Sequence, residues 1–598
     1  MTPPTPSLVP PSRREWLLVL ALTLLAAILR FQKFGGLGLS HFDEGIYALS
    51  GLWVVTPGGL FALDPQVIAY APPGFPILIG LAYSLLGISD TPALLIAIIA
   101  GLFTIPAAAW LARQSFGPGA GAAAAAFSAL SLAHIAFSRK ALTDAPFLLT
   151  WILALSLGIR FLDRPRLGRA LAFGIAVGIA QNFKYNGWLA GAIPLLAALA
   201  GLLSNPDARR PSSALRTFSL LALAAFVAAL MYLPWFRFVE NHGGYADLIR
   251  HHRGYLGGPN TWLPYWRAQL AQTIALSGGV FWGASAWIVA WLSAGFALNG
   301  SALILSRSRW DTSRLLVAYV LGASALAIIP DLAWWVGLAW SAWLIADTRP
   351  APRIVGIWWL VLSVMTPFYH PYARLWLPLH AVGWIMLAGV VVKLGPFTSN
   401  LFSTFDRSVV TRPRVLLQAF VAILCLILAL THWPVRSPRP LPYAIIFAPT
   451  SLLRTAAAQL ASSSPFPSDG SARLRVLARR PLAFYLAINR VVPFRLLPDN
   501  REILEGPGAS GEWALVDEVQ LGESLKDGPN WKTIFVEWNR TADWKVPLDA
   551  VTLLDVNPNA ASDPCPLDQP QLVLLAPRPP IPPASRPSGS ISKPDSSP

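Results

Sequence analysis

The sequence has 598 residues, of which 54% are hydrophobic and only 13% are charged. Soluble globular proteins carry about 25% charged residues, so this composition excludes an ordinary soluble enzyme and places most of the chain in lipid. The formal net charge of +16 does not indicate nucleic-acid binding, because the Lys and Arg residues separate apolar runs and do not form one basic patch. Cys425 lies in an apolar run and Cys565 in a polar region, so we expect no disulfide framework.

The apolar runs predict an all-α polytopic membrane protein with about 13 transmembrane helices. The first run, Trp16 to Leu29, is followed by Arg30 and not by a small-residue cleavage site, so we expect an uncleaved first helix. A membrane span needs about 20 mostly apolar residues. On that basis the helices are expected near residues 16–34, 91–113, 119–137, 143–161, 168–184, 188–203, 215–236, 272–305, 313–329, 331–346, 354–367, 374–393 and 414–432.

The distribution of arginine predicts the orientation of these helices. With the N-terminus inside, the inner loops of the bundle are rich in Lys and Arg and contain few acids, as the positive-inside rule requires. The apolar segment Ala71 to Ser89 contains three prolines, and counting it as a span would reverse this bias. We therefore expect it to lie at the outer membrane surface or to re-enter it. The outer loops are then 35–90, 138–143, 237–271, 368–373 and everything after residue 433.

The residue pattern of the chain changes after Trp433. Residues 440–577 alternate short β-type runs (RLRVLA, EWALVDEV, WKTIFVEW, QLVLLA) with polar turns and one helical stretch, Ser451 to Ser462. This pattern predicts a small C-terminal soluble α/β domain facing outside. Residues 1–12 and the Pro- and Ser-rich residues 578–598 are expected to be disordered, and the transmembrane domain is expected to cover 13–433.

Two outer segments carry acids. Asp43 and Glu44 follow the first helix in SHFDEGIYALSGLWVV, and an acid at a membrane surface suggests function by default. Such a carboxylate suits a general base, although Asp43 would equally suit the cap of a helix that starts near Gly45. Asp144 begins a later helix in AFSRKALTDAPFLLTW, where it either stabilises the helix dipole or faces the same outer surface as Asp43.

Several cations also lie beside outer loops. Lys184, in IAQNFKYNGWLAG, either extends to the lipid headgroups or serves the same surface as the acids. Arg374 lies with His370 in TPFYHPYARLWLPLHAVG, where it would pair with a lipid-linked phosphate or with an ordinary phospholipid. The loop 237–271 gathers histidines and aromatics that suit a sugar or isoprenoid headgroup, or equally an interfacial aromatic belt. No spacing in it matches a zinc signature.

The order of these motifs resembles the GT-C membrane glycosyltransferases. The resemblance rests on FDEGIYA, YAPPGFPILIGLAYSLLG, WLARQSFG, SRKALTDAPFLL and NFKYNGWLA, and HPYARLWLPL near 370–379 is also similar. It covers residues 13–240 best, and the related groups are the protein O-mannosyltransferases and the aminoarabinose transferases that modify lipid A. Two departures are that Ala71 stands where many relatives have His, and that the C-terminal domain has no recognisable sugar-binding trefoil.

The resemblance implies roles for matching positions. Asp43 would be the catalytic acid, supported by Glu44, with Asp144 as a second acid. The donor phosphate would be bound by Arg139, Lys140, Lys184 and Arg374, and the acceptor or sugar by His370 and Tyr372.

It also implies the reaction. The donor would be a polyprenyl-phosphate-linked sugar, the acceptor a lipid, glycan or protein outside a cytoplasmic membrane, and the reaction an inverting displacement. No cofactor is certain and a divalent metal is possible. The alternatives are a transporter or flippase of lipid-linked sugars, or a non-catalytic lipid-binding member.

Overall fold

The computed structural model describes residues 13–56, 65–204, 210–276 and 332–403, and in the C-terminal part 450–463, 465–467, 471–478, 480–497, 512–517, 539–547 and 571–576. The chain divides into two compact units, which are described separately below. The first contains residues 1–453 and 551–562, and the second contains residues 454–550 and 563–598.

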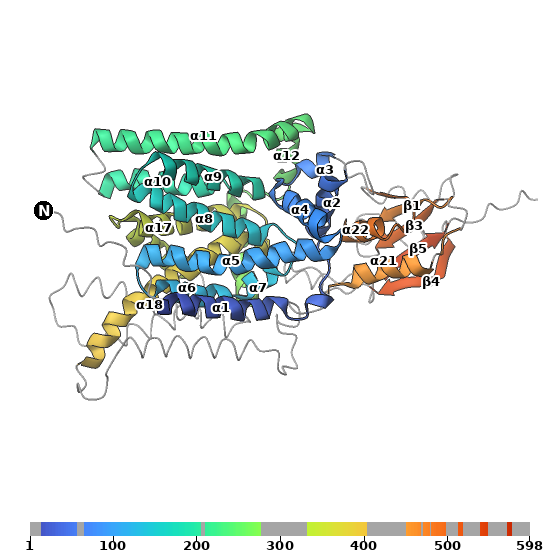
Figure 1. The fold of residues 1–598 in the computed structure, drawn as a ribbon, viewed down its shortest axis with the longest axis horizontal. Helices are drawn as coiled ribbons and strands as arrows, with labels where there is room; N and C mark the ends of the chain where they lie inside the picture. Colours follow the sequence, from blue (N-terminus) through green and yellow to red (C-terminus); the bar gives the residue numbers. More distant parts are fainter. Residues whose placement is uncertain are drawn as a thin grey trace, which may run out of the picture. The chain divides into compact units, whose positions relative to one another are not determined.

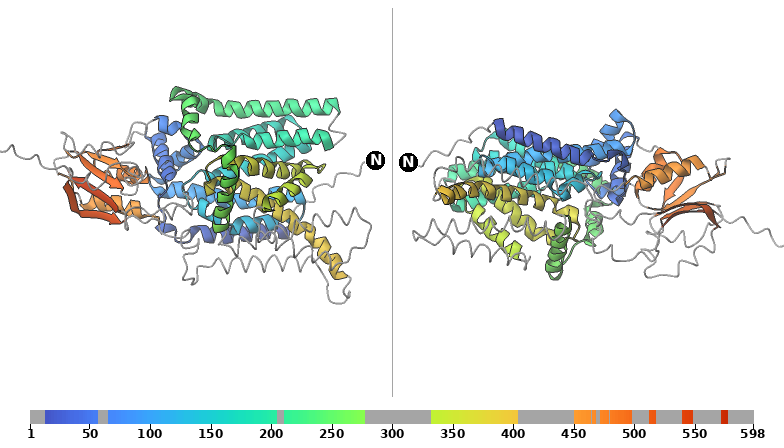
Figure 2. Two further views of the ribbon diagram at one scale, coloured as in Figure 1. Left: turned by 180° about the vertical axis from the view of Figure 1, so that it is seen from behind. Right: turned by 90° about the horizontal axis from the view of Figure 1, so that it is seen from below.

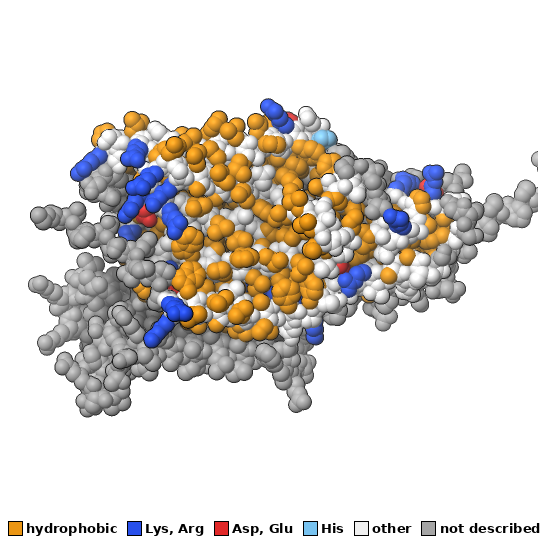
Figure 3. Space-filling view, viewed as in Figure 1, with side chains coloured by type: hydrophobic (Ala, Val, Ile, Leu, Met, Phe, Trp, Pro, Cys, Tyr) orange, Lys and Arg blue, Asp and Glu red, His pale blue; other side chains and the backbone are white. Residues whose placement is uncertain are grey.

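The first unit is a bundle of long helices that run side by side (Figure 1). Its main members are α1 (Arg13–Phe31), α5 (Asp90–Phe116), α8 (Asp144–Asp163), α9 (Leu167–Phe183), α10 (Leu189–Ser204) and α11 (Pro211–Asn241). Hydrophobic side chains cover the side of the bundle seen in Figure 3. Within the described residues, α5, α8, α11 and the segment Pro350–Phe368 are long and apolar enough to cross a membrane. The protein is therefore an integral membrane protein.

The helices expected from the sequence are present wherever the described residues allow the comparison. The predicted spans 313–329 and 414–432 lie outside those residues, as does 272–305 beyond residue 276, so the total of about 13 stays a prediction. One predicted helix, 119–137, is interrupted: α6 (Ala120–Leu130) and α7 (Leu132–Ser138) meet at a bend of 62°. Ser131 causes the break, because its hydroxyl accepts a hydrogen bond from the His134 N–H and caps α7.

Three short helices follow α1 at one end of the bundle. They are α2 (Phe42–Val55), α3 (Pro65–Ala69) and α4 (Gly74–Leu86). The helices α2 and α4 pack closely because glycines meet at their contact: a Cβ on Gly51 would lie 2.4 Å from Ile79 Cγ2. The outward side of α4 is apolar and exposed, including Leu85 at 83%. The expected helix is present, and its place at the outer membrane surface stays a prediction. The helix α2 begins at Phe42, earlier than the expected start near Gly45.

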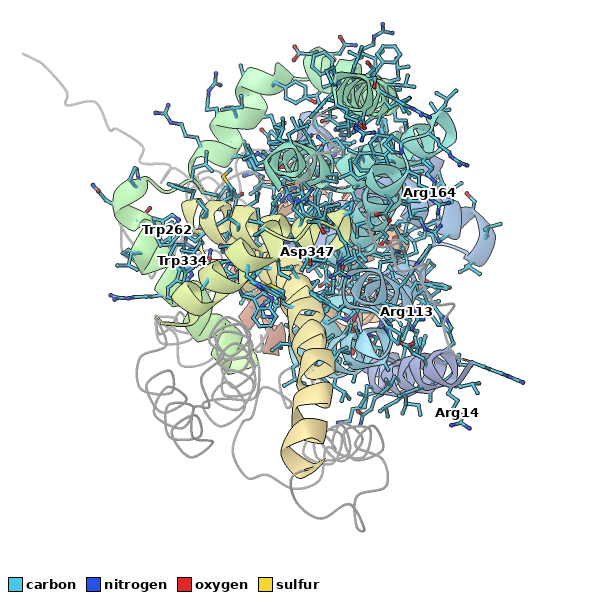
Figure 4. The ribbon with its side chains drawn as sticks, turned by 90° about the vertical axis from the view of Figure 1, so that its left-hand side faces the viewer. Arg14, Arg113, Arg164, Trp262, Trp334 and Asp347 are labelled. Atoms are coloured by element: carbon cyan, nitrogen blue, oxygen red, sulfur yellow. The ribbon has the colours of Figure 1, made fainter. Side chains whose placement is uncertain are left out.

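The predicted outer loop 237–271 is mostly helical, which corrects the sequence-based expectation. The helix α11 continues to Asn241, and α12 (Gly244–Arg253) and α13 (Pro259–Leu276) follow. The helix α13 runs across the direction of the long helices (Figure 2). Its Trp262 faces Trp334 of α16 (Leu332–Ile345), with ring centroids 6.0 Å apart (Figure 4).

The remaining described part of the bundle ends in a turn and a long helix. The helix α17 (Pro350–Met365) leads into the 3-10 turns η3 (Thr366–Phe368) and η4 (Ala373–Trp376), and then into α18 (Leu377–Ser403). An isolated antiparallel bridge joins Leu256 to Tyr369, so the chain after α12 is paired with the chain after α17. This pairing brings the histidine-rich and arginine-bearing segments together.

The two ends of the bundle carry different sets of ion pairs. At the end where α1 begins, here called the arginine end, lie Arg14, Arg113 and Arg164 (Figures 3 and 4). Arg113 forms an ion pair with Glu15, whose other oxygen accepts a bond from the Gly119 N–H at 3.0 Å. At the opposite end, here called the carboxylate end, lie Asp43, Glu44 and Asp144.

The second unit contains a five-stranded sheet with the order β2-β1-β3-β5-β4. The strand β1 (Leu474–Leu477) is parallel to β2 (Phe494–Leu496) and β3 (Trp513–Asp517), while β5 (Gln571–Ala576) is antiparallel to β3 and β4 (Asn539–Pro547). Three of the four predicted β-type runs coincide with β1, β3 and β5, and the fourth, 531–538, lies outside the described residues. The predicted helix is α21 (Leu452–Ser463), and α22 (Arg480–Ile488), β2 and β4 were not predicted.

Candidate active site

Asp43 lies in the first turn of α2 but does not cap it. The cap is His41, whose Nδ1 accepts a hydrogen bond from the Asp43 N–H at 3.0 Å. The helix begins at Phe42 and not near Gly45, so the capping explanation for Asp43 is wrong. The Asp43 carboxylate is therefore available for other contacts, and its side chain is 28% exposed.

Glu44 completes the cap and is fully buried. Its Oε2 accepts bonds from the N–H groups of Ser40 (2.9 Å) and His41 (2.7 Å). Its Oε1 accepts a bond from the Ala141 N–H at 2.7 Å, and Lys140 Nζ lies 3.9 Å from Oε2. A capping box normally joins two ends of one turn. Here the same carboxylate also ties α2 to the segment between α7 and α8.

Arg374 forms an ion pair with Asp43 across 331 positions in the sequence. Its Nη1 donates to Asp43 Oδ2 at 2.5 Å, and the Arg374 side chain is 16% exposed. The guanidinium also lies over the Tyr372 ring, 5.8 Å from its centroid. The turn η4 is thus held against the first turn of α2, and an acid and a cation expected from separate motifs meet in one place.

A second acid and cation also meet. Lys184, which ends α9, places Nζ 2.5 Å from Asp144 Oδ1, and the Asp144 side chain is only 1% exposed. The other oxygen, Asp144 Oδ2, is buried without a hydrogen-bond partner among the described residues. Thr143 Oγ1 donates to the Phe183 carbonyl at 2.9 Å, which keeps the start of α8 beside the end of α9.

Aromatic and histidine side chains surround the Asp43–Arg374 pair. His251 of α12 stacks on Tyr70, with centroids 4.0 Å apart and an interplanar angle of 5°. Burial and the neighbouring His252 lower the pKa of His251, while Asp247 and Asp43 act in the opposite direction. Burial is also the main cause that raises the pKa of Tyr369, which Asp43 raises further. Asp43 is therefore close enough to act electrostatically on both residues.

The two predicted acceptor residues belong to the same group. The His370 N–H donates to the Tyr255 carbonyl at 2.8 Å, and its ring lies 4.7 Å from the Tyr372 ring. Burial lowers the pKa of His370. Tyr255 also stacks with Tyr369, with centroids 6.0 Å apart. The histidine and tyrosines thus link α12 to the turn that carries Arg374.

Arg139 and Lys140 are placed differently from the other predicted cations. Arg139 is buried, and its Nη1 donates to the carbonyls of Arg30 (2.6 Å) and Gln32 (2.7 Å) at the end of α1. Lys140 Nζ donates to Ser40 Oγ at 2.6 Å. Both contacts join the segment after α7 to the segment before α2.

Sequence reasoning singled out neither His41 nor Tyr70, and it considered His251 only as part of the aromatic and histidine-rich loop. His41 carries a recognisable signal, because a polar residue three positions before Glu44 fits a capping box. The stacking of His251 on Tyr70 joins positions 181 apart, so no local pattern indicates it. Within the described ranges, no group of three or more His, Cys, Asp or Glu side chains is arranged to hold a metal ion.

Comparison with known proteins agrees with this architecture. The family model described as dolichyl-phosphate-mannose-protein mannosyltransferase matches residues 70–235. Comparison with curated proteins finds no match.

The chain also resembles solved structures of low sequence identity. Superposition on ArnT from Cupriavidus metallidurans bound to undecaprenyl phosphate gives a TM-score of 0.51 at 17% identity, covering 94% of this chain and 98% of that one. The oligosaccharyltransferase of Archaeoglobus fulgidus in its apo form gives 0.50 at 13% identity, covering 92% and 78%. The resemblance expected from the sequence is confirmed at the level of fold: the chain has the GT-C fold.

Proposed function

We propose that the protein is a glycosyltransferase that moves a sugar from a polyprenyl-phosphate donor to an acceptor outside the cytoplasmic membrane. The observation that carries this proposal is the Asp43–Arg374 ion pair at 2.5 Å, at the edge of a membrane bundle with the GT-C fold. A transfer from a lipid phosphate needs a base for the acceptor and a cation for the phosphate. The pair holds one of each side by side.

The reaction is an inverting displacement. The acceptor hydroxyl attacks the anomeric carbon while Asp43 accepts its proton. The bond between the anomeric carbon and the phosphate oxygen breaks, and the lipid phosphate leaves with both bonding electrons. Guanidinium groups make strong charge-assisted hydrogen bonds to phosphate, so Arg374 stabilises the charge that develops on the leaving group.

Lys184 and Asp144 form the second half of the site. Lys184 supplies another cation for the donor phosphate, and its pairing with buried Asp144 fixes where that cation lies. Lys140, which lies between Ser40 and Glu44, is a third candidate on the same side. Glu44 is placed to support Asp43 by holding the first turn of α2.

The surroundings suit the two substrates. His370, Tyr372 and the stacked Tyr70 and His251 offer aromatic and polar groups for a sugar or an acceptor. Beside Arg374, Trp376 packs with Trp266 in an apolar cluster that includes Trp262, Trp334, Leu375 and Leu379. We expect the isoprenoid chain of the donor to contact this cluster.

The arginine end faces the cytoplasm in this proposal, and the carboxylate end faces outward. The membrane is the cytoplasmic, or inner, membrane, and the site and the C-terminal domain are on its outer face. A reporter enzyme that is active only outside, fused at Ser590, should be active, and a cytoplasmic reporter at the same position should be silent. The opposite pattern would overturn this orientation.

The function is tested by incubating the purified protein with a panel of radiolabelled polyprenyl-phosphate sugars and a membrane-extract acceptor mixture. We expect one donor to be consumed and its label to appear in a product other than free sugar. Asp43→Asn is the matched control, because it removes the base and keeps the shape. Label that only crosses the membrane of a proteoliposome, still attached to its lipid, would identify a transporter instead.

A further inference from the structure

A buried group of basic side chains joins the end of α1 to the end of α7. Arg30 is fully buried, and its Nε donates to Ser138 Oγ at 2.9 Å. Its Nη1 donates to the carbonyls of Ala26 (3.2 Å) and Ala129 (3.4 Å), and its Nη2 lies 3.0 Å from His134 Nδ1. In the part of the chain that is described, no acid pairs with Arg30. A buried cation without a counter-ion is costly, so its retention calls for an explanation.

The contact is reciprocal. Arg30 of α1 holds the hydroxyl of Ser138, the last residue of α7, while Arg139, the next residue, holds the carbonyls of Arg30 and Gln32. Those carbonyls are groups that the end of a helix leaves without intrahelical partners. We call Arg30, His134, Ser138 and Arg139 the arginine clasp. The helix α5 closes it, because a Cβ on Gly101 would lie 2.4 Å from Ser138 Cβ.

Both acids of the candidate site follow directly from the clasp. One segment runs from Gln32 to Asp43, and a second segment runs from Arg139 to Asp144. Two further contacts cross-link these segments: Lys140 Nζ to Ser40 Oγ at 2.6 Å, and the Ala141 N–H to Glu44 Oε1 at 2.7 Å. The two segments are thus joined at the clasp and again at these two contacts, and they end at Asp43 and Asp144.

We propose that Arg30 and Arg139 are positioning residues, which fix the Asp43 segment against the Asp144 segment, and that Arg139 is not a phosphate ligand. This inference rests on the proposed function for its kinetic part only. The guanidinium of Arg139 is directed to backbone carbonyls of α1, which accept hydrogen bonds and repel a phosphate. A small displacement of catalytic groups, of about 1 Å, can lower a rate by about 10²-fold.

The test compares Arg139→Lys and Arg30→Lys with Arg353→Lys. Arg353 is a matched control, because it is also buried and also donates to backbone carbonyls, those of Ala197 (3.1 Å), Asp347 (2.8 Å) and Thr348 (3.2 Å). Its partner Asp347 lies at the arginine end of the bundle (Figure 4). For each full-length variant, three quantities are measured: amide hydrogen exchange, kcat with the labelled donor, and Kd for undecaprenyl phosphate without sugar.

We expect both clasp variants to speed exchange of the amides of Ser40, His41 and Ala141 by about tenfold or more. Their kcat should fall by about 10- to 100-fold, with Kd for undecaprenyl phosphate unchanged. Arg353→Lys should leave these amides and kcat as in the wild type. If a clasp variant does not fold, Gly101→Ala displaces Ser138 without removing a cation and should give the same exchange pattern.

Two results would overturn the inference. A large rise in Kd for Arg139→Lys with unchanged exchange would make Arg139 a phosphate ligand. If Arg139→Lys and Arg353→Lys lose kcat equally, and in proportion to the loss of folded protein, the clasp stabilises the fold and does not position the acids. If the wild type transfers no sugar, the proposed function fails, and the exchange data alone then decide whether the clasp fixes the two segments.

Discussion

The arginine end and the carboxylate end of the bundle use the same kinds of side chain in different ways. At the arginine end, both oxygens of Glu15 are occupied, one by Arg113 and one by the Gly119 N–H. Asp347 is similarly occupied, since Oδ1 accepts from the Arg349 N–H at 2.9 Å and Oδ2 from Arg349 Nη2 at 3.0 Å. At the carboxylate end, Asp144 has one oxygen paired and one buried without a partner in the described residues.

An acid that is buried and has both oxygens engaged by the protein stabilises the fold, and a substrate hydroxyl has little access to it. Glu44 behaves in this way even though it lies next to Asp43, because three backbone N–H groups bind it. Glu44 is fully buried, whereas the Asp43 side chain is 28% exposed, so we expect these adjacent acids to differ in role.

The largest effect is expected for Asp43→Asn. Removing a general base costs about 10²–10⁴-fold in rate, and because His41 is the cap, the helix start should survive. The initial transfer rate per mole of folded protein measures this. If Asp43→Asn keeps more than about a tenth of the wild-type rate, Asp43 is not the base and Asp144 becomes the candidate.

Lys184→Gln and Arg374→Gln should both raise the KM for the lipid donor, but they should differ in stability. Lys184→Gln leaves a carboxylate that is 1% exposed without its cation, which costs about 3–5 kcal/mol. Arg374→Gln leaves Asp43, which is 28% exposed and partly solvated, so its thermal midpoint should stay nearer the wild type. Thermal unfolding in detergent together with donor titration measures both. Unchanged KM in both variants would show that these cations do not contact the donor.

Glu15→Gln should change stability without changing catalysis. The amide oxygen can still accept from Gly119, but Arg113, whose side chain is 10% exposed, loses its anion, at a cost of about 1–3 kcal/mol. The folded fraction should therefore transfer sugar at the wild-type rate. A loss of kcat in this variant would mean that the two ends are coupled and that the comparison between them does not hold.

The smallest effect is expected from the pH dependence of the packing of α12. Because burial lowers the pKa of His251, an opened α12 binds a proton more readily than the packed one. The packing of His251 on Tyr70 is therefore fully favoured above the ordinary value of 6.5 and weakens as the pH falls through it. Amide exchange in Gly244–Arg253 at pH 7.5 and 5.5, compared with His251→Gln at each pH, measures this. Equal exchange in both proteins at pH 5.5 would show that His251 is not the responsible group.

The sequence identifies the charged residues of the site better than it predicts which of them pair with one another. Asp43, Asp144, Lys184 and Arg374 are recognisable because ionisable residues beside apolar spans are rare. Which cation meets which acid depends on the packing of α9 and η4, and no local pattern contains that information. Arg139 and Lys140 are adjacent in one motif, yet one is directed to the end of α1 and the other to Ser40. Such a difference follows from side-chain direction at the end of α7, which composition and spacing do not specify.

The 331-residue separation of Asp43 from Arg374 also has a consequence for biosynthesis. A growing chain inserts α1 and α2 long before the turn η4 leaves the ribosome. During that interval Asp43 has no Arg374 to pair with, so the pair is completed only after most of the bundle has entered the membrane. A nascent chain that stalls before residue 374 would therefore carry Asp43 without the arginine that pairs with it in the complete bundle. Under the proposed function, sugar transfer would then require that membrane insertion has reached η4.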